Sequence, residues 1–355
     1  MRVVKKIKIC IFLTILSGVA SSAFALNDVS ISGEMDVVAT LHNLPTRDQG
    51  TLAFSIPSLL LDVEGPLKEG NEFFVQLESS ENRDATSKRY NTQLRKGYLS
   101  LTSFLSPQSE VRLGLIPDFW VEIEKEGWDY SFWGMNSYLP MIRYKYSSWS
   151  DLGVMYQTEF GDDWGLWAIS ASNGEGLDSD ELGARKEFQI LAGITKAAPI
   201  YFVISYVQGA YDLYDNSFNA KTRLLTHLSY EADRGTLALE YYQTKDPANA
   251  MTTLGIAGGV DVTALAGTSV SGQGASLFGK LKVSQKWALF ARGDSLNPVK
   301  SDSKKNLQAV MAGTSYELTS DVMMALSYDS TQYGEQFSVS PRDVSRFVFA
   351  TRAVF

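Results

Sequence analysis

The stretch 343–355 reads DVSRFVFATRAVF, and it decides the fold class because its side chains alternate in character. One alternate set of this stretch comprises Phe347, Phe349, Thr351, Ala353 and Phe355. The other set carries the basic side chains of Arg346 and Arg352. A period of two with an apolar face and a charged face predicts a β-strand between two different environments. The wall strand of a membrane barrel and the edge strand of a soluble β-sandwich both fit this pattern.

The first 25 residues have the three parts of a secretory signal peptide. The basic residues Arg2, Lys5, Lys6 and Lys8 precede an apolar core that runs from residue 9 to about residue 20. Ala23-Phe24-Ala25 then forms an A-x-A cleavage site. The apolar core is too short to span a membrane as a helix. We therefore predict a signal peptide over 1–25, export from the cytoplasm and a mature chain over 26–355.

The composition of the mature chain excludes several classes of function. Cys10 is the only cysteine and lies in the signal peptide, so disulfides and thiolate metal sites are excluded. The signal peptide holds four bases and no acid, which leaves 28 bases against 40 acids and a net charge of −12. This charge disfavours nucleic acid as a partner. No second stretch approaches the roughly 20 apolar residues of a membrane-spanning helix.

The rest of the chain repeats the alternating pattern about sixteen times. Tight turns, such as Asp233-Arg234-Gly235, alternate with longer connections, and 81–92 is predicted to be one of these loops. An even number of strands with short turns at one rim is typical of a transmembrane barrel. The sequence therefore predicts an all-β, antiparallel, up-and-down barrel. The predicted strands are 30–41, 51–64, 71–80, 93–104, 110–116, 151–159, 164–172, 187–196, 200–211, 221–231, 236–245, 273–284, 287–294, 306–318, 321–331 and 342–355.

Over its whole mature length the chain resembles the general trimeric porins of Gram-negative outer membranes. The resemblance lies in the strand rhythm and in the terminal aromatic residue Phe355. It implies periplasmic turns, extracellular loops and a homotrimer in contact with outer-membrane lipid and lipopolysaccharide. It also implies that the barrel assembly machinery reads Phe355. A strand number that differs by two stays open, because 140–147 could pair as a strand extension.

The resemblance gives a role to the charged loop 117–150, which follows the fifth predicted strand. In general porins the corresponding loop folds inward and narrows the pore, and Pro117-Asp118-Phe119 loosely matches part of that loop's P-E-F-G-G element. Trp120 replaces the first glycine of the element, so only the role of the loop is transferred. The alternative is an external lid. The candidate residues of the constriction and the lumen are Lys96, Arg112, Asp118, Glu122, Glu124, Glu126, Asp129 and Arg143.

The side chains that face the lumen are predicted to be both acidic and basic. Charged side chains facing lipid cost about 2–4 kcal/mol for Arg or Lys at the bilayer midplane, so an inward orientation is favoured. The bases Lys96 and Arg112 should face the carboxylates of the loop, and the excess of acid predicts a modest cation preference. The long connection 246–272 is a second candidate for narrowing the pore or for covering a neighbouring subunit.

The predicted function is passive diffusion of ions and small hydrophilic solutes through a water-filled channel. The alternatives are a channel selective for a solute such as phosphate or a sugar, and a structural or adhesive barrel with a blocked lumen. His42 and His227 are the only histidines, which argues against a zinc cluster and against an enzyme. No cofactor and no metal site are predicted.

Overall fold

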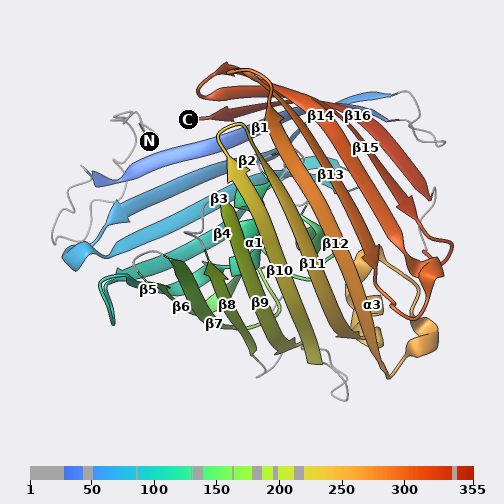
Figure 1. The fold of residues 1–355 in the computed structure, drawn as a ribbon, viewed down its shortest axis with the longest axis horizontal. Helices are drawn as coiled ribbons and strands as arrows, with labels where there is room; N and C mark the ends of the chain where they lie inside the picture. Colours follow the sequence, from blue (N-terminus) through green and yellow to red (C-terminus); the bar gives the residue numbers. More distant parts are fainter. Residues whose placement is uncertain are drawn as a thin grey trace.

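The computed structural model describes residues 28–42, 51–84, 87–128, 130, 139–161, 164–177, 186–194, 199–211, 220–337 and 342–355, with backbone only at 82–84 and 87–89. Within these ranges the chain forms one closed sheet of sixteen strands, each antiparallel to its neighbours in sequence (Figure 1). The sheet closes where β1 pairs with β16, from Glu34 opposite Val354 to His42 opposite Arg346. The predicted up-and-down barrel of about sixteen strands is confirmed.

The strands and helices have the following bounds. The strands are β1 (Ser30–His42), β2 (Leu52–Pro66), β3 (Glu72–Asp84), β4 (Ser87–Thr102), β5 (Ser109–Pro117), β6 (Ser150–Phe160), β7 (Gly165–Ser172), β8 (Glu187–Ile194), β9 (Ile200–Ala210), β10 (Ala220–Ala232), β11 (Gly235–Pro247), β12 (Ser269–Lys282), β13 (Trp287–Asn297), β14 (Leu307–Thr319), β15 (Val322–Tyr333) and β16 (Asp343–Val354). The α-helices are α1 (Phe119–Gly127), α2 (Pro140–Arg143) and α3 (Ala248–Leu254).

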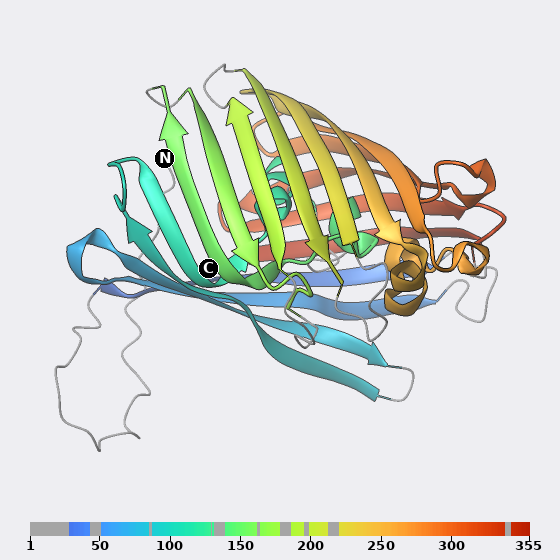
Figure 2. The ribbon, with the colours of Figure 1, turned by 90° about the horizontal axis from the view of Figure 1, so that it is seen from below.

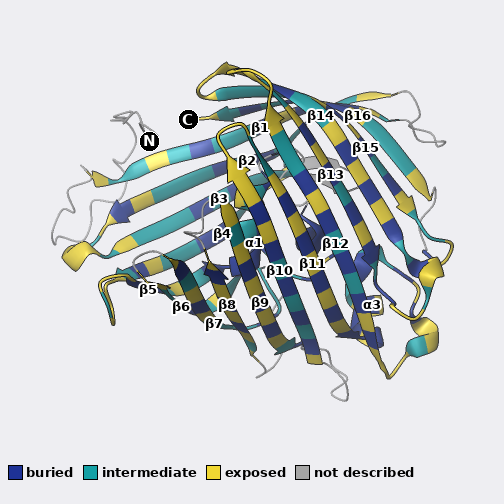
Figure 3. Ribbon diagram, in the orientation of Figure 1, coloured by how far each residue is buried: buried dark blue, intermediate teal, exposed yellow. Residues whose placement is uncertain are grey.

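The strands alternate between exposed, largely apolar side chains and buried ones, and buried charged side chains such as Asp36, Glu240 and Arg292 lie among the latter. Along β10, Arg223 and His227 are 3% exposed, whereas Leu228 and Tyr230 are 45% and 50% exposed. Figure 3 shows the same alternation of exposed and buried residues along neighbouring strands. Exposed aliphatic and aromatic side chains on the outer wall suit contact with lipid, and buried charges inside the barrel are paired. Arg352, for example, donates from Nε to Asp36 at 2.8 Å.

One hairpin contradicts the prediction. Residues 81–92 were predicted to be a loop, but β3 and β4 stay paired from Glu81 opposite Tyr90 to Asp84 opposite Ser87. The prediction was wrong because this part of the hairpin is polar and charged on both faces, so it lacks an apolar side with a period of two. The possible strand extension over 140–147 is also absent, since α2 begins at Pro140.

Two segments fill space beside the strands. Residues 118–128, 130 and 139–149 lie inside the barrel, where Figure 2 shows the green helical segment between opposite walls. Residues 248–268, with α3, lie at the rim and contact the first segment, since the backbone N–H of Ala257 donates to the carbonyl of Tyr144 at 2.8 Å. Among the described residues, no helix is long and apolar enough to cross a membrane.

The C-terminal residue takes part in closing the barrel. The backbone N–H of Gly33 donates to the carbonyl of Phe355 at 2.8 Å, and the N–H of Phe355 donates back at 3.0 Å. A Cβ atom on Gly33 would lie 2.6 Å from the ring of Phe355, so the ring occupies the space that a side chain on Gly33 would need. A glycine in β1 therefore allows the terminal aromatic ring to lie against the strand.

Candidate pore constriction

Helix α1 is the central element of the inward segment, and its start is fixed by Asp118. The Asp118 carboxylate accepts hydrogen bonds from the backbone N–H groups of Trp120 (2.7 Å) and Val121 (3.3 Å). This is the N-cap arrangement, which satisfies amides that have no partner within the helix. Burial raises the pKa of Asp118 above its ordinary value, although these bonds and one from Ser147 oppose the rise. Asp118 therefore positions the helix and does not act as an unpaired charge in the lumen.

The helical geometry sends two neighbouring acids to opposite walls. Each residue turns an α-helix by about 100°, so Glu122 and Glu124 point about 200° apart. Their partners lie on β4 and β13, which are seven strands apart one way round the closed barrel and nine the other way. The helix therefore spans the interior between two nearly opposite walls.

The contact with β4 is a single ion pair that stays accessible to water. Lys96 Nζ lies 2.6 Å from Glu122 Oε1, and the Glu122 side chain is 40% exposed. Burial alone would raise the pKa of Glu122, but the attraction and hydrogen bond of Lys96 outweigh it and lower the pKa below its ordinary value. Arg112, predicted to face the same carboxylates, is bound to Glu110 of its own strand, with Nε 2.7 Å from Oε1.

The contact with β13 is buried and shared by several charges. Arg292 donates from Nη2 to Glu124 (3.0 Å) and to Glu240 (3.2 Å), and from Nε to Asp294 (2.9 Å). The side chains of Arg292, Glu124 and Glu240 are each 1% exposed. Burial raises the pKa of Glu124 well above its ordinary value, and repulsion from Glu240 and Asp294 adds to the rise, whereas the charge and hydrogen bond of Arg292 oppose it.

Aromatic packing strengthens the contact on the β13 side. The ring of Trp128 lies edge-on to Phe278 and Phe290, with centroids 5.5 Å and 6.1 Å away. Tyr130 stacks on Phe290 at 3.9 Å, and its hydroxyl lies 3.0 Å from Ser315 Oγ. The segment is thereby packed against the inner faces of the far wall. The same buried cluster contains Val38, Leu60, Val121, Leu139, Ile142, Trp149, Ala238, Met311, Ala325, Val348 and Ala350.

The part of the segment from α2 onward is attached to strands β10 and β15. Arg143 Nη2 donates to Thr331 Oγ1 at 2.8 Å, and Arg223 Nε donates to the carbonyl of Tyr146 at 3.1 Å. Arg223 is itself held by Asp246, with Nη2 2.7 Å from Oδ1. These bonds fix Arg143 at the end of α2 to β15, and Tyr146 to β10.

A cavity of about 950 Å³ lies on the other side of the segment. It is lined by strands β4 to β8 and β10 and by residues of both segments, among them Arg95, Asp118, Lys145, Gln189, Lys221 and Ile256. Charged and polar side chains lie among apolar ones in this lining, which suits a small solute with polar groups.

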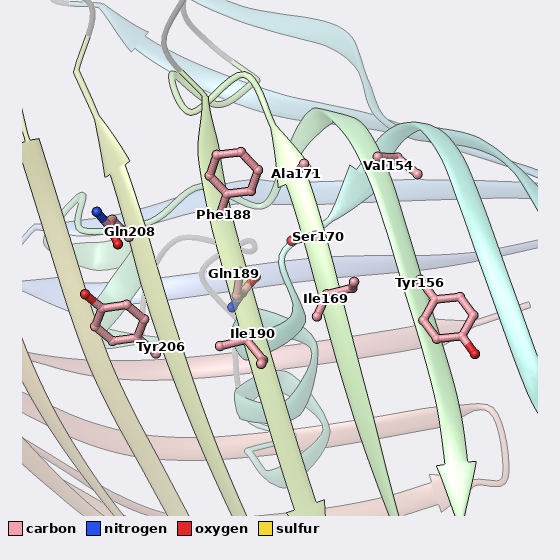
Figure 4. A pocket seen from close by; sticks show the side chains of 10 residues that line it. All are labelled: Val154, Tyr156, Ile169, Ser170, Ala171, Phe188, Gln189, Ile190, Tyr206 and Gln208. Carbon is pink, nitrogen blue, oxygen red and sulfur yellow. The ribbon is translucent and has the colours of Figure 1, made fainter.

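A second hollow, of about 470 Å³, lies on the outer wall over β6–β9. Figure 4 shows Ile169, Phe188, Ile190 and Tyr206 around it. Because these side chains are on the exposed apolar face of the strands, the hollow belongs to the lipid-facing surface and takes no part in the lumen.

Comparison with known proteins bears on the fold. No protein-family model matches the sequence, and no curated protein matches it. Solved structures do match over 92% of this chain. An anion-selective porin from Comamonas acidovorans has a TM-score of 0.65 at 13% identity over 99% of its chain. The outer membrane channel DcaP of Acinetobacter baumannii has a TM-score of 0.66 at 9% identity over 97% of its chain. A trimer form of OmpT, an outer membrane protein of Vibrio cholerae, has a TM-score of 0.62 at 14% identity over 99% of its chain.

The chain has the fold of an outer-membrane porin. The match covers 92% of this chain, which includes nearly the whole of its closed sixteen-strand barrel.

Within this porin fold the predicted site residues have different surroundings. Lys96 and Glu122 meet, Glu124 is buried against Arg292, and Glu126 is exposed. Asp118 caps α1, Arg112 pairs on its own strand, and Arg143 bonds to β15. Asp129 lies outside the described residues. Their role in permeation stays a prediction.

Several residues of the interior were not predicted, among them Asp294 and Arg95. Asp294 binds Arg292, and the alternation along β13 already places both on one face, so this partner was readable. Arg95 is 3% exposed and pairs with Glu78 although its neighbour Lys96 is also buried. A register shift between Gln76 and Leu77 opposite these residues turns both inward, and the sequence carries no signal for it.

Proposed function

We propose that the chain forms an outer-membrane channel through which ions and small hydrophilic solutes diffuse. The observation that carries this proposal is a closed barrel with an apolar outer wall, a charged interior and a segment that spans the interior between β4 and β13. Solved proteins with the same fold include a porin and an outer membrane channel. Electrostatics at the narrowest point would then govern which ions pass.

The proposed selectivity is a weak preference for cations. Glu122 is neutralised by Lys96, and Glu124 is buried, so the exposed Glu126 is the carboxylate of α1 that acts most freely on a passing ion. Charges closer than the Debye length, about 8 Å at physiological salt, are poorly screened in a narrow pore. The electric field of Glu126 alone is weaker than the field that five unpaired carboxylates would give if all the predicted acids, Asp118, Glu122, Glu124, Glu126 and Asp129, faced the lumen.

A specific observation also favours a second function, that of a structural barrel with a filled lumen. The inner faces of the far wall pack against the segment, since Val38 and Ala350 are fully buried and Met311 is 2% exposed. Such packing leaves little space on that side. The cavity near β6–β8 then decides whether solutes can pass.

Purified protein in a planar lipid bilayer distinguishes these functions. Discrete current steps that scale with salt concentration support a diffusion channel. Block that saturates with one solute supports a selective channel. A folded, heat-modifiable protein that gives no current at any pH or salt concentration contradicts the channel.

The location and assembly belong to the same proposal. We infer a homotrimer in the outer membrane of a Gram-negative bacterium, in contact with lipopolysaccharide and folded by the barrel assembly machinery. A trimer form among the solved relatives supports the oligomer. A molar mass of a monomer, measured by light scattering in mild detergent, would contradict the homotrimer. The predicted signal peptide 1–25 lies outside the described residues.

Phe355 is proposed to act in assembly. Its ring lies against Gly33 and its backbone pairs with the same residue, so it closes the barrel and stays 55% exposed on the outer wall. Deleting Phe355 should lower the amount of heat-modifiable barrel in the outer membrane. An unchanged amount would contradict this role.

A further inference from the structure

The β13 contact of α1 holds more acid than base. Glu124 from the helix, Glu240 from β11 and Asp294 from β13 all surround one guanidinium, that of Arg292. His227 from β10 adds a further titratable group, with Nδ1 3.2 Å from Glu240 Oε1. With a neutral imidazole, three carboxylates thus face a single positive charge in a site that excludes water.

One carboxylate oxygen in this site is free to carry a proton. Glu124 Oε1 accepts from Arg292, whereas Glu124 Oε2 is buried with no partner among the described residues. An isolated buried charge is costly, and a proton on this oxygen removes one of the three negative charges. The neutral carboxyl can still accept the bond from Arg292 through Oε1.

The other groups that face Glu124 do not supply a second cation. Tyr242 on β11 and Tyr144 after α2 lie near the cluster, and both hydroxyls are buried without a partner among the described residues. Ser276 on β12 is neutral and lies in register between Glu240 and Asp294. Arg292 and His227 are therefore the only groups of the described cluster that can be positive.

We propose that the contact between Glu124 and the Arg292 cluster is a pH-sensitive clamp, which holds α1 against β13 while Glu124 is protonated and releases the helix as the pH rises. The proposal rests on the channel function proposed above for its consequence, a wider lumen at high pH. The clamp itself is a property of the contact and does not depend on conduction.

The direction follows from proton linkage. Burial raises the pKa of the docked Glu124 above that of a Glu124 exposed to water, so the docked state binds more protons. Docking is then fully favoured at low pH and weakens as the pH rises through the raised pKa. For one proton the docking equilibrium falls at most about tenfold per pH unit.

Conductance against pH, recorded with the full-length folded protein, tests the consequence. The unaltered channel should conduct more as the pH rises from mildly acidic to alkaline values. Glu124→Gln retains an oxygen for Arg292 and cannot ionise, so it should stay at the low-pH conductance throughout. Glu317→Gln, which removes an exposed carboxylate near the end of β14, should keep the unaltered profile. The same pH profile in Glu124→Gln would overturn the proposal.

Cysteine labelling tests the clamp without any current. Because the mature chain lacks cysteine, Val121→Cys places one thiol on a fully buried face of α1, and Gln285→Cys places one in an exposed turn as reference. The ratio of their reaction rates with a charged methanethiosulfonate cancels the common effect of pH on the thiol. A ratio that rises with pH supports the clamp even if no current is found, in which case only the channel function fails. A pH-independent ratio in a conducting protein overturns the clamp and leaves the channel function intact.

Discussion

Two sides of α1 make contacts of opposite character through the same residue type. On the β4 side Glu122 faces one lysine and is 40% exposed, whereas on the β13 side Glu124 is 1% exposed among an arginine and two other carboxylates. The pKa of Glu122 is lowered and that of Glu124 is raised. A spacing of two residues on a helix sends the two side chains to different walls. The groups on each wall then decide whether the pKa of the glutamate is raised or lowered.

The largest expected effect comes from removing the cation of the buried contact between α1 and β13. Arg292→Met leaves Glu124, Glu240 and Asp294 without their shared cation, and losing one partner of a buried ion pair costs about 3–5 kcal/mol. We expect α1 to leave β13, so Val121→Cys should become accessible to labelling at neutral pH. Arg346→Met, at an arginine that pairs with Asp329 of β15, is the matched control and should leave the thiol protected. Equal protection in both arginine variants would show that Arg292 does not hold the helix.

An intermediate effect is expected from a neutral bond on the same side. Tyr130→Phe removes the hydroxyl that lies 3.0 Å from Ser315 but keeps the ring stacked on Phe290. A hydrogen bond of this kind contributes about 0.5–1.5 kcal/mol. Labelling of Val121→Cys should therefore rise by a smaller factor than in Arg292→Met. A rise as large as that of Arg292→Met would mean that the charged cluster is not the main contact.

The β4 contact should contribute least to docking and most to selectivity. The Lys96 side chain is buried but Glu122 is 40% exposed, so water screens the pair, and exposed ion pairs are worth about 0–1 kcal/mol. Lys96→Gln should therefore change the labelling of Val121→Cys less than either Arg292→Met or Tyr130→Phe. It frees the Glu122 carboxylate, however, and should shift the zero-current potential in a salt gradient toward cations. Glu122→Gln frees Lys96 and should shift the potential toward anions. Shifts of the same sign in both variants would contradict an ion pair that lies along the ion path.

Lowering the pH tests the contact between α1 and β4. Since the pKa of Glu122 is lowered, its pair with Lys96 is present above the ordinary glutamate range and is lost as the pH falls through the lowered pKa. We therefore expect the Glu122→Gln and unaltered channels to differ in ion preference at neutral pH and to converge in strong acid. Persistent differences at low pH would show that another group sets the preference.

The sequence was sufficient for the barrel and insufficient for the contacts inside it. Alternation placed Arg352 and Phe349 on opposite faces of the last strand, as found, because a strand with lipid on one side keeps a period of two. It failed for 81–92, where both faces of the hairpin are polar. It also grouped Glu122 with Glu124, because their difference depends on a helix and on which walls that helix reaches. The paired burial of Arg95 and Lys96 depends on a register shift that no local pattern encodes.

The most direct test of the account is to modify α1 in a conducting channel. Glu126 is exposed on this helix, and Cys10, the only cysteine of the sequence, lies in the predicted signal peptide. Glu126→Cys therefore places the only thiol after residue 25 at the proposed constriction. Adding a bulky charged methanethiosulfonate to the bath while single-channel current is recorded should reduce the current in steps, because the label would stand in the ion path. A current that stays constant while mass spectrometry shows complete labelling would place α1 away from that path and contradict the account.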